Sequence, residues 1–263
     1  MIYQLQPHEF AKAKSFFIPL IKFQAMCISV LNHDYPGMVY VDDRDHPTSA
    51  CLLTWITKKE YGLWGFLAGD PDNTAFLTHL HDGLFEKTII EENVPVILFT
   101  PSPDQDWSEA IKAICAPRAP IPFPRRHYSC QQLTFDWRSQ VPEGIEIRKI
   151  DHSFYRNPNL ILHEEVQDTV EKWFGEMNGK TGDIGFAAMD GNTVAAWMTI
   201  DFISNGVGDV GVHTLESHRR RGLAAITSAA AMEYAFEHGI NTIHWTCAAD
   251  NEGSFRTAEK LGY

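Results

Sequence analysis

The chain has 263 residues, of which 44% are hydrophobic and 21% are charged, so it can bury two domain cores of ordinary size. Acidic residues outnumber basic residues by 34 to 22, which gives a formal net charge of -12 at pH 7. Such a charge repels nucleic acid and anionic membrane surfaces and so excludes both as partners, whereas it favours cationic ligands such as amines.

The cysteines and the first residues indicate a cytoplasmic protein. The cysteines are odd in number, lack any CxxC or Cys/His zinc spacing, and therefore predict free thiols, with no disulfide framework and no metal. The apolar stretch from Phe16 to Phe23 is short and is interrupted by Pro19 and Lys22, so we expect no signal segment and no membrane span. The five cysteines are Cys27, Cys51, Cys115, Cys130 and Cys247.

The N-terminal half, residues 1–140, has the pattern of an α/β unit. A proline-rich excursion from Pro101 to Pro124 follows its last strand, and the turn signal at residues 141–144 places the domain boundary near residue 140. In chain order we expect helix Pro7–Leu31, strands Met38–Val41, Cys51–Thr57 and Leu63–Ala68, helix Thr74–Glu91, strand Val94–Phe99, helix Trp107–Ile114 and strand His127–Trp137.

The C-terminal half, residues 141–263, predicts strand, helix, three strands, helix, strand and helix. Turns at Asp190-Gly191-Asn192 and Ser204-Asn205-Gly206 join the three central strands into an antiparallel meander, which argues against a doubly wound dinucleotide-binding sheet. The N-terminal half is a weaker version of this order, and an internal duplication or a coincidence of two α/β halves would both explain it. The expected elements are Ile145–Ile150, Leu160–Met177, Ile184–Met189, Thr193–Ile203, a strand ending near Thr214, Leu223–Phe236, Thr242–Cys247 and Asn251–Lys260.

An arginine-rich loop joins the third meander strand to the next helix, in the sequence Val212-His213-Thr214-Leu215-Glu216-Ser217-His218-Arg219-Arg220-Arg221-Gly222-Leu223-Ala224. Gly222 and the small Ala224 let consecutive backbone N–H groups approach an anion, the helix adds the positive end of its dipole, and the arginines add charge. The segment therefore predicts a pyrophosphate site. The corresponding loop of the N-terminal half, Gly69-Asp70-Pro71-Asp72-Asn73, carries carboxylates that would repel a pyrophosphate.

The pattern Arg219-x-x-Gly222-x-Ala224 resembles the Q/R-x-x-G-x-G/A signature of the GNAT N-acetyltransferase superfamily. The resemblance covers about residues 141–263, including the strand order and a second similar stretch from Asn251 to Tyr263. It implies an α+β fold, in which a mixed, largely antiparallel sheet is flanked by helices. The N-terminal half would then be a second α/β unit that binds no cofactor, either a degenerate relative of the same fold or an α/β half that is similar by coincidence.

The resemblance also implies a binding site for acetyl-coenzyme A. The backbone of Val212, His213 and Thr214 would pair with the pantetheine arm where two parallel strands splay apart. A backbone N–H of His213 or Thr214 would polarise the thioester carbonyl. Asn251 and Ser254 would face the cofactor near its thioester end. The pyrophosphate would be held by Arg219, Arg220, Arg221, Gly222, Leu223, Ala224 and Ala225.

The family reaction is direct attack of a neutral amine on the thioester, which needs a base for the ammonium proton and an acid for the thiolate. Many members have a tyrosine as the acid where Ala258 stands here, and a glutamate as the base where Thr246 stands. Ser254 is the candidate acid that remains. The candidate bases are His213, Asp201, His244 and Glu165, although a histidine on a strand is often structural and an aspartate at a strand end is often solvated surface.

The sequence also departs from the family pattern after the Leu-Gly-aromatic triplet, where two more strands usually follow. Either the N-terminal half supplies the missing strands, with His127–Trp137 as a candidate, or the sheet edge is left for a partner chain, as in a homodimer. We expect an N-acetyltransferase that moves an acetyl group from acetyl-coenzyme A to the primary amine of a small molecule. Because the usual tyrosine and glutamate are absent, the alternative is a non-enzymatic acyl-coenzyme A binding or sensing protein.

Overall fold

The computed structural model describes residues 2–55, 62–85, 96–164, 166–167 and 184–263. The chain forms two compact units, of which unit 1 comprises Met1–Phe123 and unit 2 comprises Pro124–Tyr263. The units meet after Phe123 and not near residue 140, because the segment that follows Pro124 pairs with the sheet of unit 2. Within the described residues, no helix is both long enough and apolar enough to cross a membrane.

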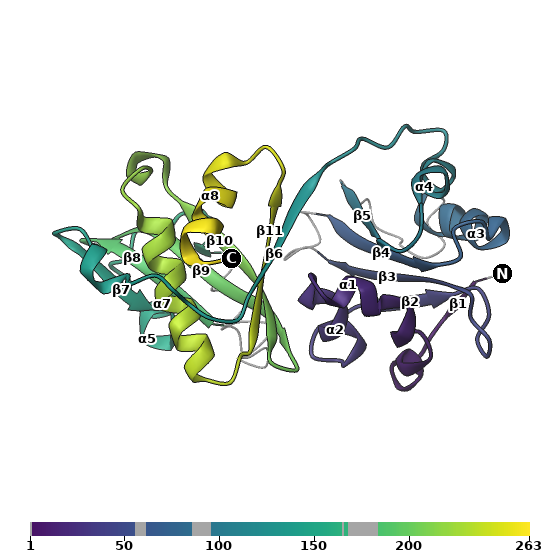
Figure 1. Ribbon diagram of the computed structural model, residues 1–263, viewed down its shortest axis with the longest axis horizontal. Helices are drawn as coiled ribbons and strands as arrows, with labels where there is room; N and C mark the ends of the chain where they lie inside the picture. The colour runs from purple at the N-terminus through teal and green to yellow at the C-terminus, as the bar shows by residue number, and fades with distance from the viewer. Residues whose placement is uncertain (1, 56–61, 86–95, 165, 168–183) are drawn as a thin grey trace. The chain divides into compact units, whose positions relative to one another are not determined.

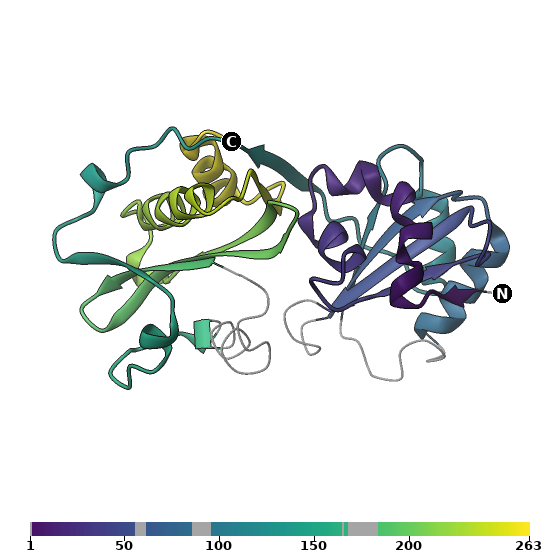
Figure 2. The ribbon, with the colours of Figure 1, turned by 90° about the horizontal axis from the view of Figure 1, so that it is seen from below.

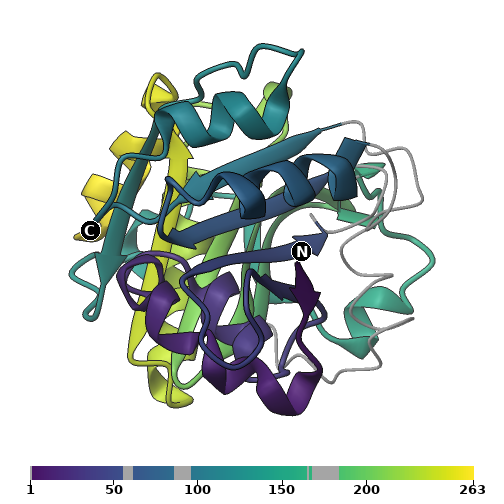
Figure 3. The same cartoon turned by 90° about the vertical axis from the view of Figure 1, so that its right-hand side faces the viewer.

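Unit 1 is built on a five-stranded sheet in the order β1-β2-β3-β4-β5 (Figure 1). Neighbouring strands are antiparallel except for β4 and β5, which are parallel. Helices α3 (Thr74–Phe85) and α4 (Ser108–Cys115) bury Phe76, Leu80 and Ile114 against one face of the sheet (Figure 3). The strands are β1 (Tyr3–Gln4), β2 (Met38–Val41), β3 (Ser49–Trp55), β4 (Leu63–Gly69) and β5 (Ile97–Pro101).

The single helix expected over Pro7–Leu31 is instead divided into four short helical segments. The last division falls at Gln24, whose extended backbone (φ -139°, ψ 98°) interrupts the helix just before α2. Parts of other expected elements, namely residues 56–57, 86–91, 94–95, 165 and 168–177, lie outside the described residues. The four segments are η1 (Pro7–Lys12), η2 (Lys14–Phe17), α1 (Ile18–Ile21) and α2 (Ala25–Leu31).

Unit 2 is built on a six-stranded sheet in the order β6-β11-β10-β9-β8-β7, in which β10 and β11 form the parallel pair. The expected antiparallel meander of β8, β9 and β10 is confirmed. The helices are α5 (His152–Tyr155), α7 (Leu223–Glu237) and α8 (Glu252–Leu261), with short turns η4 (Arg138–Gln140) and η6 (Glu216–His218). The strands are β6 (Arg125–Cys130), β7 (Ile145–Lys149), β8 (Ile184–Asp190), β9 (Thr193–Ser204), β10 (Val207–Thr214) and β11 (Thr242–Ala248).

Helices lie on both sides of the unit 2 sheet (Figure 2), and each face of the sheet packs a core of its own. Because side chains alternate along a strand, Met198 of β9 faces α7 and α8, whereas its neighbour Trp197 faces the other side. Small residues of α7 such as Ala229 let that helix pack closely against Trp245 of β11. On the opposite side Trp197 packs with Phe154 of α5. We call these two sides the α7/α8 face and the α5 face.

Strand β6 lies beside β11, so the segment before the C-terminal half supplies a further strand of the sheet. The two strands are antiparallel, with pairs from Ile243 and Cys130 to Ala248 and Arg125. The strand expected as far as Trp137 ends at Cys130, because β11 begins at residue 242 and offers no further partners.

The sheet of unit 1 and strands β7 to β11 of unit 2 have the same topology. In each, four strands form an antiparallel series and a fifth runs parallel to the fourth. A helix connects the fourth and fifth strands, α3 in unit 1 and α7 in unit 2, and another helix follows the fifth. This correspondence favours an internal duplication over a coincidence of two α/β halves.

Candidate functional site

The parallel strands β10 and β11 separate part-way along their length. They form three residue pairs, the last of which joins Asp209 to His244. Beyond it, and within the described residues, β10 runs on to Thr214 paired with β9 alone, and β11 runs on to Ala248 paired with β6 alone. We call this divergence, between residues 210–214 and 245–248, the splay. It lies where the resemblance implies a place for the thioester arm.

A bulge in β9 lies opposite the start of the splay. Val207 pairs with Ser204 and Asp209 pairs with Asp201, so β9 places two residues, Phe202 and Ile203, opposite the single Gly208 of β10. A Cβ at Gly208 would lie 2.6 Å from Cγ2 of Ile200, so a side chain there would displace the Ile200 side chain. Bulges bend a strand and increase its twist, and this one ends at Asp209, the last β10 residue that pairs with β11.

Helix α7 (Leu223–Glu237) follows β10 after the short turn η6 and the three arginines of the loop. Its N-cap is Gly222, whose φ of 78° lies in the left-handed region that glycine adopts without steric cost. No side chain caps the helix, so the first N–H groups, those of Leu223, Ala224 and Ala225, have no intrahelical acceptor and no capping acceptor. Such N–H groups, together with the positive end of the helix dipole, form an anion site.

The three arginines of the loop differ in their partners. Arg221 Nη1 lies 3.1 Å from Asp190 Oδ2, and this bond lowers the pKa of the Asp190 carboxyl group. Arg219 Nε donates to the backbone oxygen of Thr214 over 3.4 Å. Arg220 is exposed, and in the described part of the chain no carboxylate lies within ion-pair distance of it. Its guanidinium is therefore the one most available to a bound phosphate.

The β10 residues expected along the pantetheine arm lie at the open part of the splay. Val212 packs on the α7/α8 core, and Thr214 follows on the same face. The Thr214 Oγ1 atom is buried and has no hydrogen-bond partner among the described residues. Because buried hydroxyl groups normally have partners, this atom fits a polar ligand that binds between the strand and the uncapped helix.

Asn251 and Ser254 come together at the first turn of α8. Asn251 is the N-cap, and its side-chain oxygen accepts a hydrogen bond from the Ser254 N–H over 3.1 Å. The cap leaves the Asn251 amide nitrogen for a ligand. The Ser254 Oγ atom accepts a hydrogen bond from Trp245 Nε1 over 3.0 Å. Trp245 is the first residue of β11 beyond its pairing with β10, so Ser254 lies near the narrow end of the splay.

Two of the predicted bases, His213 and Asp201, lie on the α5 face. The His213 ring stacks on Trp197 with a centroid separation of 4.5 Å, and the His163 ring lies 5.7 Å from His213. Asp201 accepts a hydrogen bond from Thr199 Oγ1 over 2.7 Å. His213 is thus on β10, beside the splay, whereas Asp201 is on β9, one strand farther from it.

The other two candidate bases are His244, which is buried, and Glu165. His244 is 3% exposed, and its Nδ1 lies 2.8 Å from Ser129 Oγ, which separates the ring from an amine in solvent. Glu165 lies outside the described residues. Among the residues that are described, no group of three His, Cys, Asp or Glu side chains could hold a metal ion.

Strand β6 adds an imidazole that the sequence analysis did not single out. His127 Nδ1 lies 3.1 Å from Oγ1 of Thr246, the position at which the resemblance places a glutamate. Burial, and after it the charge of Arg125, lowers the pKa of His127 and so favours a neutral ring. The sequence did contain a clue to this residue. The sheet needed a further strand beside β11, and the candidate for that strand was the segment that starts at His127.

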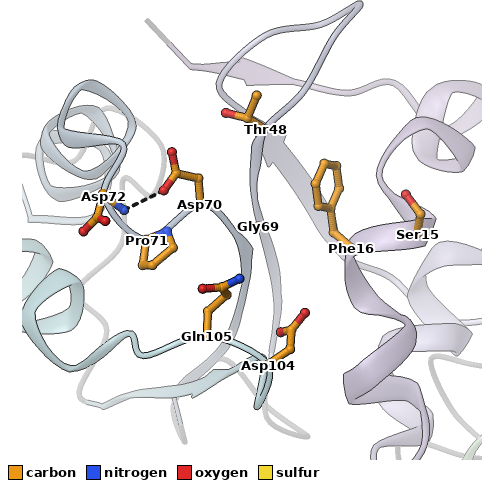
Figure 4. Close-up of a pocket in the computed structure, with 9 residues that line it drawn as sticks. All are labelled: Ser15, Phe16, Thr48, Gly69, Asp70, Pro71, Asp72, Asp104 and Gln105. Atoms are coloured by element: carbon orange, nitrogen blue, oxygen red, sulfur yellow. Dashed lines mark hydrogen bonds between the residues drawn. The ribbon is translucent and has the colours of Figure 1, made fainter.

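The equivalent place in unit 1 has the opposite chemistry. Strands β4 and β5 stay paired over all five residues of β5. At the start of α3, the Asn73 side-chain oxygen accepts a hydrogen bond from the Phe76 N–H over 3.0 Å. An open cavity of about 450 Å³ beside this loop is lined by three carboxylates (Figure 4), those of Asp70, Asp72 and Asp104. The charge there disfavours a diphosphate.

Comparisons with known proteins cover nearly the whole chain. A family model described as GNAT acetyltransferase matches residues 20–263. An uncharacterized N-acetyltransferase of Bacillus subtilis (strain 168), YdfB, is 28% identical over 241 residues, which are 89% of this chain and 84% of that protein.

Two solved structures are similar in fold to the whole chain. A GCN5-related N-acetyltransferase-like protein from Streptococcus suis 89/1591 has a TM-score of 0.62 and 21% identity, and the match covers 97% of this chain and 94% of that one. A tandem GNAT protein from the clavulanic acid biosynthesis pathway has a TM-score of 0.60 and 13% identity, over 100% of this chain and 94% of that one. The second similarity agrees with the repeated topology of the two units.

Proposed function

Because this chain belongs to the GNAT acetyltransferase family, we propose that it is an N-acetyltransferase that moves the acetyl group of acetyl-coenzyme A to the primary amine of a small molecule. Unit 2 binds the coenzyme, and unit 1 does not. The observation that carries the proposal is the uncapped amino end of α7 at Gly222, directly after the strand that diverges at the splay.

The residues around Gly222 hold the diphosphate of the coenzyme. The N–H groups of residues 222–225 donate to its oxygens, and the Arg220 guanidinium adds a charge-assisted hydrogen bond. Arg219 and Arg221 contribute charge, although each already has a protein partner. The pantetheine arm extends along the β10 edge from Thr214 toward Val212, where β11 no longer occupies the place of a partner strand within the described residues.

The transfer itself takes place across the sheet. On the α5 face, His213 accepts a proton from the ammonium form of the acceptor, with Asp201 as the alternative base. The neutral nitrogen attacks the thioester carbon, a C–N bond forms and the C–S bond breaks. A backbone N–H of His213 or Thr214 stabilises the developing oxyanion. The Ser254 hydroxyl donates a hydrogen bond to the departing thiolate, which takes its proton from the former amine nitrogen.

Electrostatics favour a cationic acceptor. The chain carries a net charge of -12, and Asp201 and Asp209 occupy facing positions on the α5 side of β9 and β10. Two carboxylates close together attract an ammonium group from solvent. We therefore propose a small primary amine as the acceptor, which one unit of this size can enclose more readily than a protein terminus.

One observation favours the alternative, an acyl-coenzyme A binding or sensing protein. Ala258 is fully buried and has no acidic side chain, and Thr246 has no carboxylate at the place where the family pattern has a base. Release of free thiol from acetyl-coenzyme A, measured with a panel of small amines, separates the two functions. Thiol release that depends on an amine supports the enzyme, whereas tight binding without thiol release across the panel supports the sensor.

A further inference from the structure

We propose that Trp245 is a positioning residue of the transfer site, and that its indole N–H orients the Ser254 hydroxyl toward the sulfur of the bound coenzyme. The proposal rests on the proposed function and adds to it a residue that lies outside both sequence motifs. It starts from one contact, the 3.0 Å hydrogen bond between Trp245 Nε1 and Ser254 Oγ.

The direction of this hydrogen bond follows from the chemistry of its partners. An indole N–H can donate but cannot accept, so Ser254 Oγ is the acceptor. The hydroxyl proton of Ser254 must then point elsewhere. Among the described residues no other acceptor lies within hydrogen-bonding distance of it. The proton is therefore available to an acceptor that enters the site, and a thiolate is such an acceptor.

The indole is held rigidly. Trp245 is 1% exposed and belongs to the core between the sheet, α7 and α8. The Tyr263 ring packs edge-on against it, with ring centroids 5.6 Å apart, and Tyr128 of β6 is its partner in the ladder. Because the indole cannot rotate freely, the hydroxyl is oriented before the coenzyme binds, which is how a fixed donor stabilises a developing charge.

The location of the pair suits the sulfur end of the coenzyme. Trp245 directly follows His244, the last β11 residue paired with β10, and its side chain lies on the α7/α8 face. The uncapped amino end of α7 lies on this same face of the sheet. His213 lies on the opposite, α5 face. The donor to the thiolate and the base for the amine are thus on opposite sides of the splay, as direct transfer from one to the other requires.

The Tyr263 hydroxyl is the nearest competitor for the same role. It is buried and, within the described residues, has no hydrogen-bond partner. Burial, followed by the nearby Cys130 and Asp209, raises the pKa of Tyr263 well above its usual value, so the hydroxyl stays protonated. A phenol held in this way could also donate to a thiolate. The variant Tyr263→Phe therefore has to be measured beside the Trp245 variant.

The test is a double-mutant cycle with Trp245→Phe and Ser254→Ala, in which kcat and KM for acetyl-coenzyme A are measured with an amine that the thiol-release panel identifies. Trp64→Phe is the matched control, since Trp64 Nε1 makes a hydrogen bond of the same length, 3.0 Å, to Thr100 Oγ1 in unit 1. Both tryptophan variants remove one indole N–H and keep an aromatic ring.

We expect Trp245→Phe and Ser254→Ala each to lower kcat about tenfold, with KM changed by less than about twofold, because a hydrogen bond to a charged group is lost. The double variant should be no slower than Ser254→Ala alone, because the indole acts through the hydroxyl. Trp64→Phe should leave both constants unchanged. Multiplicative losses, an unchanged kcat for Trp245→Phe, or a loss confined to Tyr263→Phe would each overturn the proposal.

A second measurement leaves Trp245 in place and therefore does not depend on the folding of its variant. In the ¹H–¹⁵N spectrum, Ser254→Ala should shift the indole resonance of Trp245 and leave that of Trp64 unchanged; equal shifts, or none, would contradict the hydrogen bond. If wild-type protein releases no thiol with any amine, the proposed function fails and this proposal fails with it. If wild type is active and the cycle is additive, the positioning role alone is refuted.

Discussion

Units 1 and 2 share a strand order and differ most at one joint, between the fourth strand and the helix that follows it. In unit 2, β9 has a bulge opposite Gly208, and β10 leaves β11 after three pairs. In unit 1, β4 keeps a continuous register with β3 and stays paired with β5 over all five residues of β5. The helix after the joint is uncapped in unit 2, whereas Asn73 caps it in unit 1.

This contrast shows how few positions determine what the fold can bind. The strand order is the same in both units, but three local features distinguish the proposed site: a bulge in β9 beside the splay, a glycine at the start of a helix and the sign of the loop charge. Unit 2 has arginines in that loop, and unit 1 has Asp70 and Asp72. Function therefore lies in the joint and not in the topology.

We expect the largest effect from a variant that gives α7 of unit 2 a helix cap like the one in unit 1. Gly222→Asp puts a carboxylate at the amino end of α7, where it occupies the free N–H groups and repels the diphosphate. We expect coenzyme A affinity to fall about 100-fold or more in calorimetric titrations. Gly239→Asp is the matched control, because Gly239 also has a positive φ, 89°, with open space around it, at the other end of α7. Equal losses in both variants would contradict the anion site.

The second test concerns the base, for which unit 1 has no proposed counterpart. His213→Gln should lower kcat about 100-fold and leave coenzyme A affinity unchanged, since general-base catalysis contributes roughly that factor. Asp201→Asn and His127→Gln, on the strands that flank β10 and β11, should have smaller effects. If the largest loss of kcat followed His127→Gln, the base would come from β6, and the assignment of His213 would be wrong.

A third test measures how much the arginines of the unit 2 loop contribute to coenzyme A binding. Arg220→Ala should weaken coenzyme A binding about tenfold and reduce its dependence on salt, because a charge-assisted hydrogen bond to phosphate is lost. Arg221→Ala should weaken binding less, since Arg221 already pairs with Asp190. Calorimetry at two salt concentrations gives both quantities. The reverse ranking would show that Arg221 leaves Asp190 for the ligand.

The smallest effect on binding is expected from a charge pair inside unit 1. Hydrogen bonds from Arg44 to Glu9 are the main reason that the pKa of Glu9 is lowered from 4.5 to about 2. A lowered carboxyl pKa stabilises the fold above pH 4.5, and this stability is lost as the pH falls from 4.5 toward about 2. Glu9→Gln should therefore lower the thermal midpoint at pH 7, with a difference from wild type that shrinks over that range.

Coenzyme A affinity at pH 7 is the companion measurement for Glu9→Gln. Under the proposed function it should equal that of wild type, since the proposal assigns the diphosphate to unit 2 alone. A loss of affinity in a variant that remains folded would show that unit 1 contributes to the site.

Much of unit 2 could be predicted from its sequence, because its signals are local. The turns at Gly191 and Gly206 predict the meander. The three arginines followed by Gly222 predict the start of α7. What could not be predicted depends on contacts between distant segments. His127 and Thr246 are 119 residues apart, and no periodicity within β6 points to β11. The continuous pairing of β4 and β5 is equally non-local, as is the capping of α3 by a side chain that the sequence shows only as part of an acidic loop.

The most direct test of the account is a crystal structure of the full chain with coenzyme A. The account predicts one molecule per chain, with its diphosphate on the N–H groups that follow Gly222 and its sulfur between Val212 and Ser254. A diphosphate bound in unit 1, or a Gly222 turn filled by a protein side chain with the coenzyme elsewhere, would contradict it.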